Sequence, residues 1–422
     1  MQHRKPFLNL LTALSGLMFI ALLGASCGTS SQKTPSTTNA PAGAPINAAN
    51  SESALAYVNN PKSDNISGLS ANNQKSTVSA IPGSPFPAPS YPIDVAASGD
   101  FLFVASTGVN ALNSAEFVLT TYRVDAASGA LTNSSTLNLS GIFSGGGYPN
   151  NIVVDPAGKF LYMSVTGGQD PGGPRILVFS IDANAGTLSE VTNSPFVLTE
   201  QFTAYHMAIS PDGGFLFAAV FEGTGGGFVA PPHGVQVIAR DQNSGTLSTP
   251  LLPLAEASTS LGHAEVSHLA VTPSGNFLVG TAISMNTVFV WSIDSNTGAL
   301  TQVSNFGDPV HTNTIAPMGV AIDPSGKFVI VANSQSSNVS VFSLSSTGTL
   351  TAVPGSPFPG GNGPTSVAIS ASGNLVFVGN VGSNDMSVFQ LDAATGKLTG
   401  VQGSPFPIGT SAFNLMTVVT IH

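Results

Sequence analysis

The stretch that decides the fold is Ile322-Asp323-Pro324-Ser325-Gly326-Lys327-Phe328-Val329, a Pro-x-Gly turn between two apolar segments. Five related stretches occur elsewhere in the chain, with glycines at Gly99, Gly158, Gly213, Gly275 and Gly373. The intervals between successive glycines lie between 47 and 62 residues. Self-similarity at such a period indicates a structural unit of about 50 residues that is repeated along the chain.

A second turn follows each of these stretches, with a small residue before glycine and a leucine two residues after it. Its glycines are Gly129, Gly186, Gly245, Gly298, Gly348 and Gly396. Between the turns polar and apolar residues alternate, as in Val339-Ser340-Val341-Phe342-Ser343-Leu344. This alternation predicts half-buried β-strands, and the glycines supply the positive φ of tight hairpins. Each unit is therefore predicted to be four antiparallel strands, the blade of a β-propeller.

Six complete units are visible, and a seventh is present in part. Strands are expected at 54–58, 66–71 and 75–81, but the innermost strand of that unit is missing. An apolar segment at 415–421 follows the last complete unit and has no unit of its own. We expect this segment to complete the first blade, because closure of the ring removes exposed strand edges. The predicted fold is an all-β, seven-bladed propeller in one domain, residues 54–422.

The composition limits the possible partners of the protein. The chain has 422 residues, 11 Lys and Arg, 21 Asp and Glu and a formal net charge of −10. Nucleic-acid binding is not expected, because phosphate contacts require clustered basic residues. A hydrophobic content of 42% is enough for a large core and excludes global disorder.

The N-terminal residues 1–27 read as a targeting sequence. Arg4 and Lys5 precede an apolar run at 7–23, which is typical of a secretory signal. Cys27, the only cysteine, follows in a context that resembles a bacterial lipobox, so we expect it to carry a lipid; ordinary cleavage with a bystander cysteine is the alternative. Residues 28–53 are rich in Ser, Thr, Pro and Ala and are expected to form a flexible linker. The expected protein is a monomer in a bacterial cell envelope that meets the membrane only through this anchor.

The repeat resembles the lactonase family of seven-bladed propellers, the group similar to bacterial 6-phosphogluconolactonase and to fungal muconate-lactonizing enzyme. The resemblance covers about residues 54–421. Two segments, 329–333 and 376–380, also look like the Tyr-Val-Thr-Asn repeats of bacterial surface propellers. The resemblance implies lactone hydrolysis, although propellers host many unrelated activities.

Long connections and histidines point to one face of the ring. The connections between the second and third strands are longest in blades 2 to 4, at 106–117, 165–175 and 220–234, and loops often carry function. His206 and His268 each lie seven residues before a turn glycine, in the innermost strands of adjacent blades. We predict that they are catalytic, since a neutral imidazole can act as a base. The predicted ligand-binding residues around them are His233, His263, His311, Glu222 and Arg175. In the alternative interpretation the histidines cap strands and satisfy buried backbone groups.

The family resemblance supports part of this site. His206 matches a family histidine, and His268 matches the histidine of a Pro-Arg-His motif whose arginine is replaced by Ser267. The family glutamate falls at about Ile283, and a further family arginine falls at Ser334. Serine and isoleucine cannot supply the oxyanion stabilisation or proton transfer of those groups. Phosphogluconolactone chemistry is therefore not expected.

Two functions remain open after this reading of the sequence. In the first, an exported lactonase-like propeller binds a small polar lactone or sugar derivative at the long-loop face, with its hydrolysis as an open alternative to binding alone. In the second, a non-catalytic envelope propeller binds a protein or glycan partner. Neither a cofactor nor a metal is predicted, because the histidines lack metal-ligand spacing.

Overall fold

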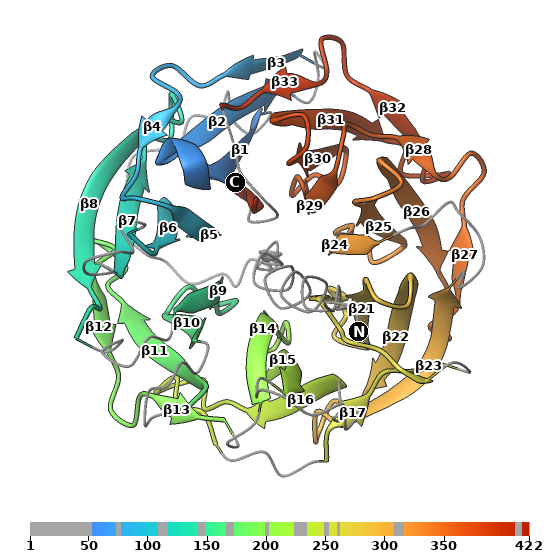
Figure 1. Ribbon diagram of the computed structural model, residues 1–422, viewed down its shortest axis with the longest axis horizontal. Coiled ribbons are helices and arrows are strands. Elements are labelled where there is room, and N and C mark those ends of the chain that lie inside the picture. Colours follow the sequence, from blue (N-terminus) through green and yellow to red (C-terminus); the bar gives the residue numbers. More distant parts are fainter. Residues whose placement is uncertain are drawn as a thin grey trace, which may run out of the picture.

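The computed structural model shows seven blades arranged around a central axis (Figure 1). It describes the following residues: 53–72, 77–108, 117–141, 148–165, 173–198, 202–222, 234–248, 253–259, 262–307, 316–409 and 416–421. Within these residues the fold is almost entirely β, with one short 3-10 turn, η1 (Pro61–Ser63). The prediction of an all-β, seven-bladed propeller is confirmed.

Each blade is a four-stranded antiparallel sheet whose strands follow one another outward from the axis. The innermost strands, in blades 1 to 7, are β34 (Val418–Ile421), β5 (Pro92–Ser98), β9 (Pro149–Val154), β14 (Phe202–Ile209), β20 (His268–Val271), β24 (Pro317–Ile322) and β29 (Pro364–Ile369). The second strands are β1 (Ser53–Asn60), β6 (Phe101–Ser106), β10 (Phe160–Val165), β15 (Phe215–Glu222), β21 (Phe277–Ala282), β25 (Phe328–Asn333) and β30 (Leu375–Asn380).

The outer half of each blade is less uniform in length. The third strands are β2 (Asn65–Asn72), β7 (Val118–Val124), β11 (Arg175–Ile181), β16 (Gly234–Ala239), β22 (Thr287–Ile293), β26 (Asn338–Leu344) and β31 (Asp385–Leu391). The outermost strands are β3 (Thr77–Ala80), β8 (Leu131–Asn138), β12 (Leu188–Glu190), β17 (Ala255–Glu256), β23 (Leu300–Gly307), β27 (Leu350–Ala352) and β32 (Leu398–Gly400). A small hairpin, β18 (Ser258–Thr259) with β19 (Gly262–His263), lies between blades 4 and 5 in the sequence.

The two ends of a blade are named here by their connections. At the turn end, the innermost strand turns into the second strand through the Pro-x-Gly stretches. At the loop end, the second strand leads into the third. Because the strands are antiparallel, each innermost strand begins at the loop end.

The ring closes as the sequence predicts. β34 pairs with β1 in antiparallel register, from Leu55 opposite Ile421 to Val58 opposite Val418. β34 also contacts β5 and β29, so that the innermost strands form a continuous circle. The described closing strand starts at Val418 rather than at residue 415, which lies outside the described residues.

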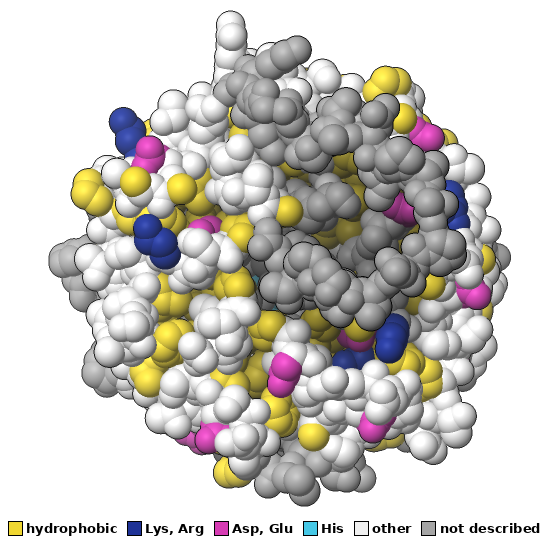
Figure 2. Space-filling view, turned by 180° about the vertical axis from the view of Figure 1, so that it is seen from behind, with side chains coloured by type: hydrophobic (Ala, Val, Ile, Leu, Met, Phe, Trp, Pro, Cys, Tyr) yellow, Lys and Arg dark blue, Asp and Glu magenta, His cyan; other side chains and the backbone are white. Residues whose placement is uncertain are grey.

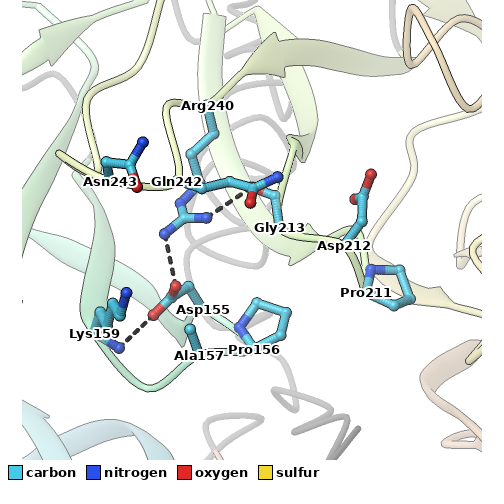
Figure 3. Close-up of a pocket in the computed structure, with 10 residues that line it drawn as sticks. All are labelled: Asp155, Pro156, Ala157, Lys159, Pro211, Asp212, Gly213, Arg240, Gln242 and Asn243. Atoms are coloured by element: carbon cyan, nitrogen blue, oxygen red, sulfur yellow. Dashed lines mark hydrogen bonds and ion pairs between the residues drawn. The ribbon is translucent and has the colours of Figure 1, made fainter.

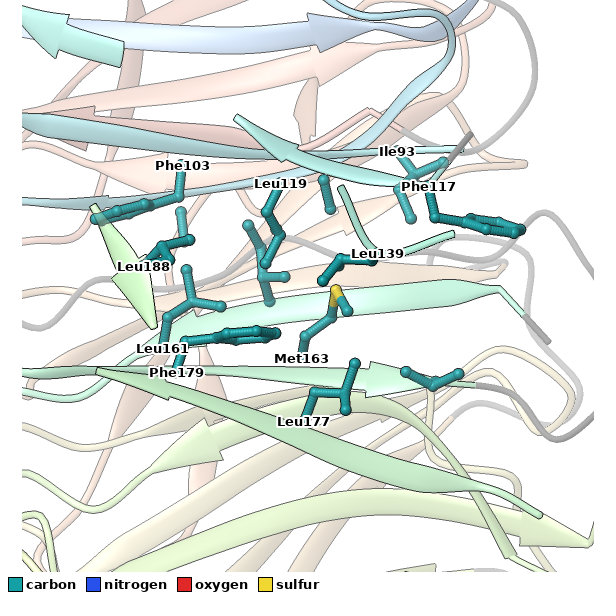
Figure 4. Close-up of a cluster of buried hydrophobic side chains, with 14 of the residues drawn as sticks. Ile93, Phe103, Phe117, Leu119, Leu139, Leu161, Met163, Leu177, Phe179 and Leu188 are labelled. Carbon is teal, nitrogen blue, oxygen red and sulfur yellow. The ribbon is translucent and has the colours of Figure 1, made fainter. Parts of the chain in front are cut away.

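The hydrophobic core lies between the blades. Figure 4 shows one cluster, in which Phe103 and Leu119 of blade 2 face Leu161 and Leu177 of blade 3, all buried. Burial of such apolar surface stabilises a fold by about 25 cal/mol per Å². Trp291 is 1% exposed and stacks on Phe289, as expected for a core residue.

The repeated turns have the backbone that the sequence predicts. The glycines of the second repeated turn, from Gly129 to Gly396, have φ between 70° and 82°. A Cβ at Gly186 would lie 2.5 Å from the Phe101 ring of the neighbouring blade, so glycine is required there on two grounds.

The Ser-Pro-Phe segments add an element that the sequence analysis missed. Four short strands pair with the third strand of their blade: β4 (Phe86–Pro87), β13 (Phe196–Val197), β28 (Phe358–Pro359) and β33 (Phe406–Pro407). Phe86 and Phe358 are buried, whereas Phe196 and Phe406 are half-buried.

Candidate functional site

The two predicted catalytic histidines meet at the loop end of the innermost strands. His206 of β14 pairs with Ala219, and His268 of β20 occupies the same register position opposite Thr281. Their ring centroids lie 5.0 Å apart with a tilt of 41°. Each is 1% exposed. The fold therefore brings the imidazoles of two neighbouring blades into contact near the axis.

His206 belongs to a series of bonds that link one blade to the next. Its Nδ1 accepts a hydrogen bond of 3.2 Å from the backbone N–H of Leu269. Asn151 Oδ1 in blade 3 accepts from Met207 N at 2.8 Å, and Asp94 Oδ2 in blade 2 accepts from Ile152 N at 2.7 Å. In each case the donor is the backbone N–H of the residue that directly follows the equivalent position in the next blade. We call Asp94, Asn151 and His206 the inter-blade acceptors.

His268 occupies the next position of the series but does not continue it. Among the described residues, no protein group hydrogen-bonds either of its buried ring nitrogens. Blade 6 carries Gly319 at the equivalent position, where a Cβ would lie 2.7 Å from the backbone of Ser366. Burial and the neighbouring His206 hold the pKa of His268 well below its usual range. His268 is therefore a neutral imidazole whose two nitrogens can bind a polar ligand.

Asp94 is a buried carboxyl group that the sequence analysis missed. Besides Ile152 N, it accepts hydrogen bonds from Asn151 Nδ2 at 2.8 Å and from Thr417 Oγ1 at 2.6 Å. It thus joins blades 1, 2 and 3 at the ring closure. Burial raises its pKa to about 7, although these hydrogen bonds act in the opposite direction.

Asp94 and His206 occupy equivalent positions, but the turn between the first two strands of blade 2 is shorter, so counting from the turn glycine does not show the equivalence. Counting seven residues back from Gly99 gives Pro92, whereas the pairing with Ala105 places Asp94 at the histidine position. Strand register, rather than distance from the glycine, was the information required.

Of the other predicted ligand-binding residues, Arg175 is the one whose side chain belongs to the described part of the chain. Arg175 is the first residue of β11 and is buried beside Val165 and Val197. Glu222 ends β15 and His263 lies in β19, but their side chains are not described. The positions that fall outside the described residues are His233, His311 and Cys27.

A pocket of about 240 Å³ lies at the turn end, far along the strands from the histidines. Figure 3 shows Arg240 pointing at Asp155, with an N–O distance of 2.7 Å; both side chains are 1% exposed. Arg240 also donates to Gly213 O at 2.7 Å and to the Tyr162 hydroxyl. Because these bonds occupy the guanidinium on all three sides, we interpret it as a staple between blades 3 and 4.

Two further features are absent from the described residues. Within them, no three His, Cys, Asp or Glu side chains come together in a way that could hold a metal ion. Nor does that part of the chain contain a helix of the length and hydropathy needed to cross a membrane.

The model of one family, described as "Lactonase, 7-bladed beta-propeller", matches residues 119–250 and 232–360, more than half of the chain. The chain belongs to this family. No curated protein matches this lactonase-family propeller.

Solved structures resemble the propeller over nearly their whole length. A candidate 6-phosphogluconolactonase from Bacteroides fragilis is 17% identical, with a TM-score of 0.68 over 89% of this chain and 99% of that one. The periplasmic gluconolactonase PpgL of Pseudomonas aeruginosa is 19% identical, with a TM-score of 0.66 over 88% of this chain and 99% of that one. A Lactobacillus plantarum protein is 17% identical, with a TM-score of 0.65 over 87% of this chain and 100% of that one. At these identities the likeness concerns the fold.

Proposed function

We propose that the loop end of the propeller binds a small polar lactone or sugar derivative and that the histidine pair opens the lactone. The observation that carries this proposal is the contact of His206 with His268, whose neutral ring has two buried nitrogens that bond to no group of the described residues. A buried polar group of this kind costs free energy until a ligand satisfies it. Membership of the lactonase family supports the choice of a lactone.

In the proposed reaction water attacks the carbonyl carbon of the lactone. His268 accepts the proton that the water loses, and the carbonyl carbon–ring oxygen bond then breaks. The ring oxygen takes that proton back, so the product is a hydroxy acid and the histidine is unchanged. Burial and the neighbouring His206 lower the pKa of His268, so its ring is neutral at neutral pH and has a lone pair that can accept the proton.

The test is a panel of lactones assayed with the purified protein and with three variants, which are His206→Asn, His268→Asn and the double variant that combines them. Asparagine can still accept the Leu269 bond, as Asn151 accepts the Met207 bond in the preceding blade. We expect turnover to fall by about 100-fold or more in His268→Asn, the usual effect of removing a general base. No turnover of any lactone, or unchanged turnover in the double variant, would reject this function.

A second candidate is a non-catalytic propeller that binds a protein or glycan partner in the cell envelope. It is favoured by the Leu269 bond of His206, which gives this histidine a structural role like that of Asn151. Recovery of the same partner from an envelope extract by the wild-type protein and by His268→Asn would favour this candidate. Recovery of none would count against it.

We propose further that the protein is exported and anchored through a lipid on Cys27. The support is the basic and apolar order of residues 4–23 before that cysteine. In a bacterial host the wild-type protein should fractionate with membranes and incorporate labelled fatty acid, and Cys27→Ala should do neither. Equal fractionation of the wild type and Cys27→Ala would reject the proposed lipid anchor.

A further inference from the structure

The tyrosines of the chain divide into two groups of three. Tyr57, Tyr122 and Tyr162 donate their hydroxyls to backbone carbonyls in other segments, which are Gly129, Pro87 and Gly245. Each of the three is buried at 4% exposure or less. Tyrosines of this group are structural, because the ring fills the core and the hydroxyl staples a turn or loop.

The second group lies at the loop end of blades 2 to 4, the last of which carries His206. Tyr91 and Tyr148 immediately precede β5 and β9, and Tyr205 lies within β14, next to His206. All three are half-buried, so each ring packs on protein with one part and faces outward with another. Tyr91 and Tyr148 pack against the same hydrophobic cluster, between blades 2 and 3.

Two tyrosines of this group have an unusual backbone conformation. Tyr91 has a φ of 55°, which bulky residues rarely adopt, and its N–H donates to Asp64 Oδ1 at 2.7 Å. Tyr205 is the extra residue of a β-bulge between Ala204 and His206. Bulges at such positions re-aim a side chain.

Glu265, which precedes β20, completes this group. Tyr148 and Glu265 both influence the pKa of Tyr205, so each of the two side chains lies near Tyr205. Burial and these neighbours raise the pKa of Tyr205 above its ordinary value, and it remains a neutral phenol. A neutral aromatic ring, a carboxylate and imidazoles suit a ligand with apolar C–H faces and many hydroxyls.

The loop end is poor in positive charge. Of the Lys and Arg side chains in the described residues, only Lys62 and Arg175 lie there, and Arg175 is 5% exposed. Five lie at the turn end instead, which are Arg123, Lys159, Arg240, Lys327 and Lys397. None of the undescribed stretches after residue 76 contains Lys or Arg.

Acidic residues outnumber Lys and Arg at the loop end, among the described residues. Positions of Asp and Glu at this end are Asp64, Glu222, Glu256, Glu265 and Asp385. The face shown in Figure 2, by comparison, carries several Lys and Arg side chains (dark blue), some of them next to Asp and Glu side chains (magenta). A phosphate group is held by clustered cations, and the loop end repels it instead.

We propose that Tyr148, Tyr205 and Glu265 form a recognition subsite beside the histidine pair for an uncharged sugar-type ring, and that this end of the propeller disfavours a phosphorylated ring. The inference rests on the proposed function in one respect, that the ligand binds at the loop end. It adds the chemical class of the ligand ring, the residues that contact this ring and the phosphate group that they disfavour.

The test measures binding rather than turnover, with the full chain and two stable probes. The probes are D-glucono-1,5-lactam, an uncharged analogue of a sugar lactone, and its 6-phosphate, both titrated by calorimetry. We expect the lactam to bind about 10-fold or more tightly than its phosphate, a difference of about 1.4 kcal/mol. Tighter or equal binding of the phosphate, or no binding of either probe, would overturn the inference.

Charge variants show whether the local field sets this preference. Glu265→Lys should narrow the ratio of the two affinities by about 3-fold or more at low salt, and less at high salt. Asp100→Lys, an exposed change of equal charge at the turn end, is the control and should leave the ratio unchanged. Equal effects of the two variants would show that net charge alone is responsible and would reject the subsite.

Ring variants test the tyrosine directly. Tyr205→Phe keeps the ring and should bind the lactam within about 3-fold of the wild type, whereas Tyr205→Ala should lose about 10-fold or more. Equal binding by both variants would remove Tyr205 from the subsite. Binding of the lactam without hydrolysis of any lactone would reject the proposed reaction and leave this subsite in place.

Discussion

Blades 2 to 5 and blades 6, 7 and 1 are built from the same repeat but approach the axis with different side chains. In blades 2 to 4 the inter-blade acceptors Asp94, Asn151 and His206 each hold the backbone of the next blade. In blades 6 and 7 the equivalent positions are Gly319 and Ser366, which are too small to reach across. Side chains thus tie blades 2 to 5 to one another, whereas blades 6 and 7 meet by close backbone approach at Gly319.

The connections at the loop end differ in the same way. In blades 6, 7 and 1 the second strand ends in Asn333, Asn380 and Asn60, and each Nδ2 donates to two side chains of the following strand. These connections are short and nearly identical. Blades 2 to 4 have longer connections at the same end. One half of the ring therefore consists of nearly identical repeats, while the other half carries the polar groups of the candidate site.

The largest expected effect comes from the removal of the carboxyl that joins blades 1, 2 and 3. Asp94→Ala leaves the donors of Ile152, Asn151 and Thr417 buried without an acceptor, and it should lower the free energy of unfolding by about 3 kcal/mol or more. Urea denaturation measures this change. Asp100→Ala, an exposed substitution in the adjoining turn, should change stability by less than about 0.5 kcal/mol. A loss below about 1 kcal/mol in Asp94→Ala would mean that the series does not tie the blades.

The same carboxyl predicts a pH dependence. The pKa of Asp94 is raised to about 7 in the folded state, whereas an unfolded aspartate titrates near about 4. Between these two pKa values the folded protein keeps a proton on Asp94 that the unfolded chain has lost. This contribution to stability is therefore present at low pH and is lost as the pH rises through about 7.

Asp94→Asn should remove this dependence, because asparagine does not titrate. From about pH 5 to about pH 8 the wild type should lose about 2 kcal/mol more unfolding free energy than the variant, as measured by urea titrations. The lowered pKa of His268 acts in the opposite direction in both proteins and cancels from the difference. Parallel pH profiles would show that Asp94 stays ionised in the fold.

Gly319→Ala probes the side of the ring that relies on backbone approach. The added Cβ would lie 2.7 Å from Ser366 Cα and 2.8 Å from Thr365 O, and backbone cannot give way as a flexible side chain does. We expect a loss of about 1–3 kcal/mol, the usual range for overpacking. Gly400→Ala is the matched control, since a Cβ there meets nothing within 4 Å. Equal thermal stabilities of the two variants would argue against close packing of blades 6 and 7.

The smallest expected effect separates the structural role of His206 from its proposed catalytic role. His206→Ala loses the acceptor for Leu269 N and should cost about 1–2 kcal/mol of unfolding free energy, whereas His206→Asn should recover most of it. Thermal denaturation of both variants gives the comparison. An asparagine variant as unstable as the alanine variant would show that the Leu269 bond contributes nothing.

Much of the fold was predictable from residues that recur. The period of the turn glycines, the alternation within strands and the unmatched segment at the C-terminus predicted seven blades and the closure of β34 on β1. Both follow from local chemistry, because a positive φ or a period of two is visible within a few residues. The pairing of β4, β13, β28 and β33 was missed, since two-residue strands carry no periodicity.

The candidate site was predictable only in part. His206 and His268 were found because they stand at the same distance from their glycines. Asp94 was missed because its turn is shorter, and Tyr148, Tyr205 and Glu265 were missed because their repeats do not align by counting. A bulge or a short turn shifts the count by one or two residues, and only strand register restores the equivalence.

By itself the sequence determined the repeating unit, the number of units and the residue that each turn requires, because those properties depend on neighbours along the chain. The tertiary structure decided which side chains of different blades meet. His206 holds the backbone of the next blade and His268 holds none, since the following blade presents a glycine in close contact with its neighbour. That difference depends on packing between segments about 50 residues apart, which no local pattern encodes.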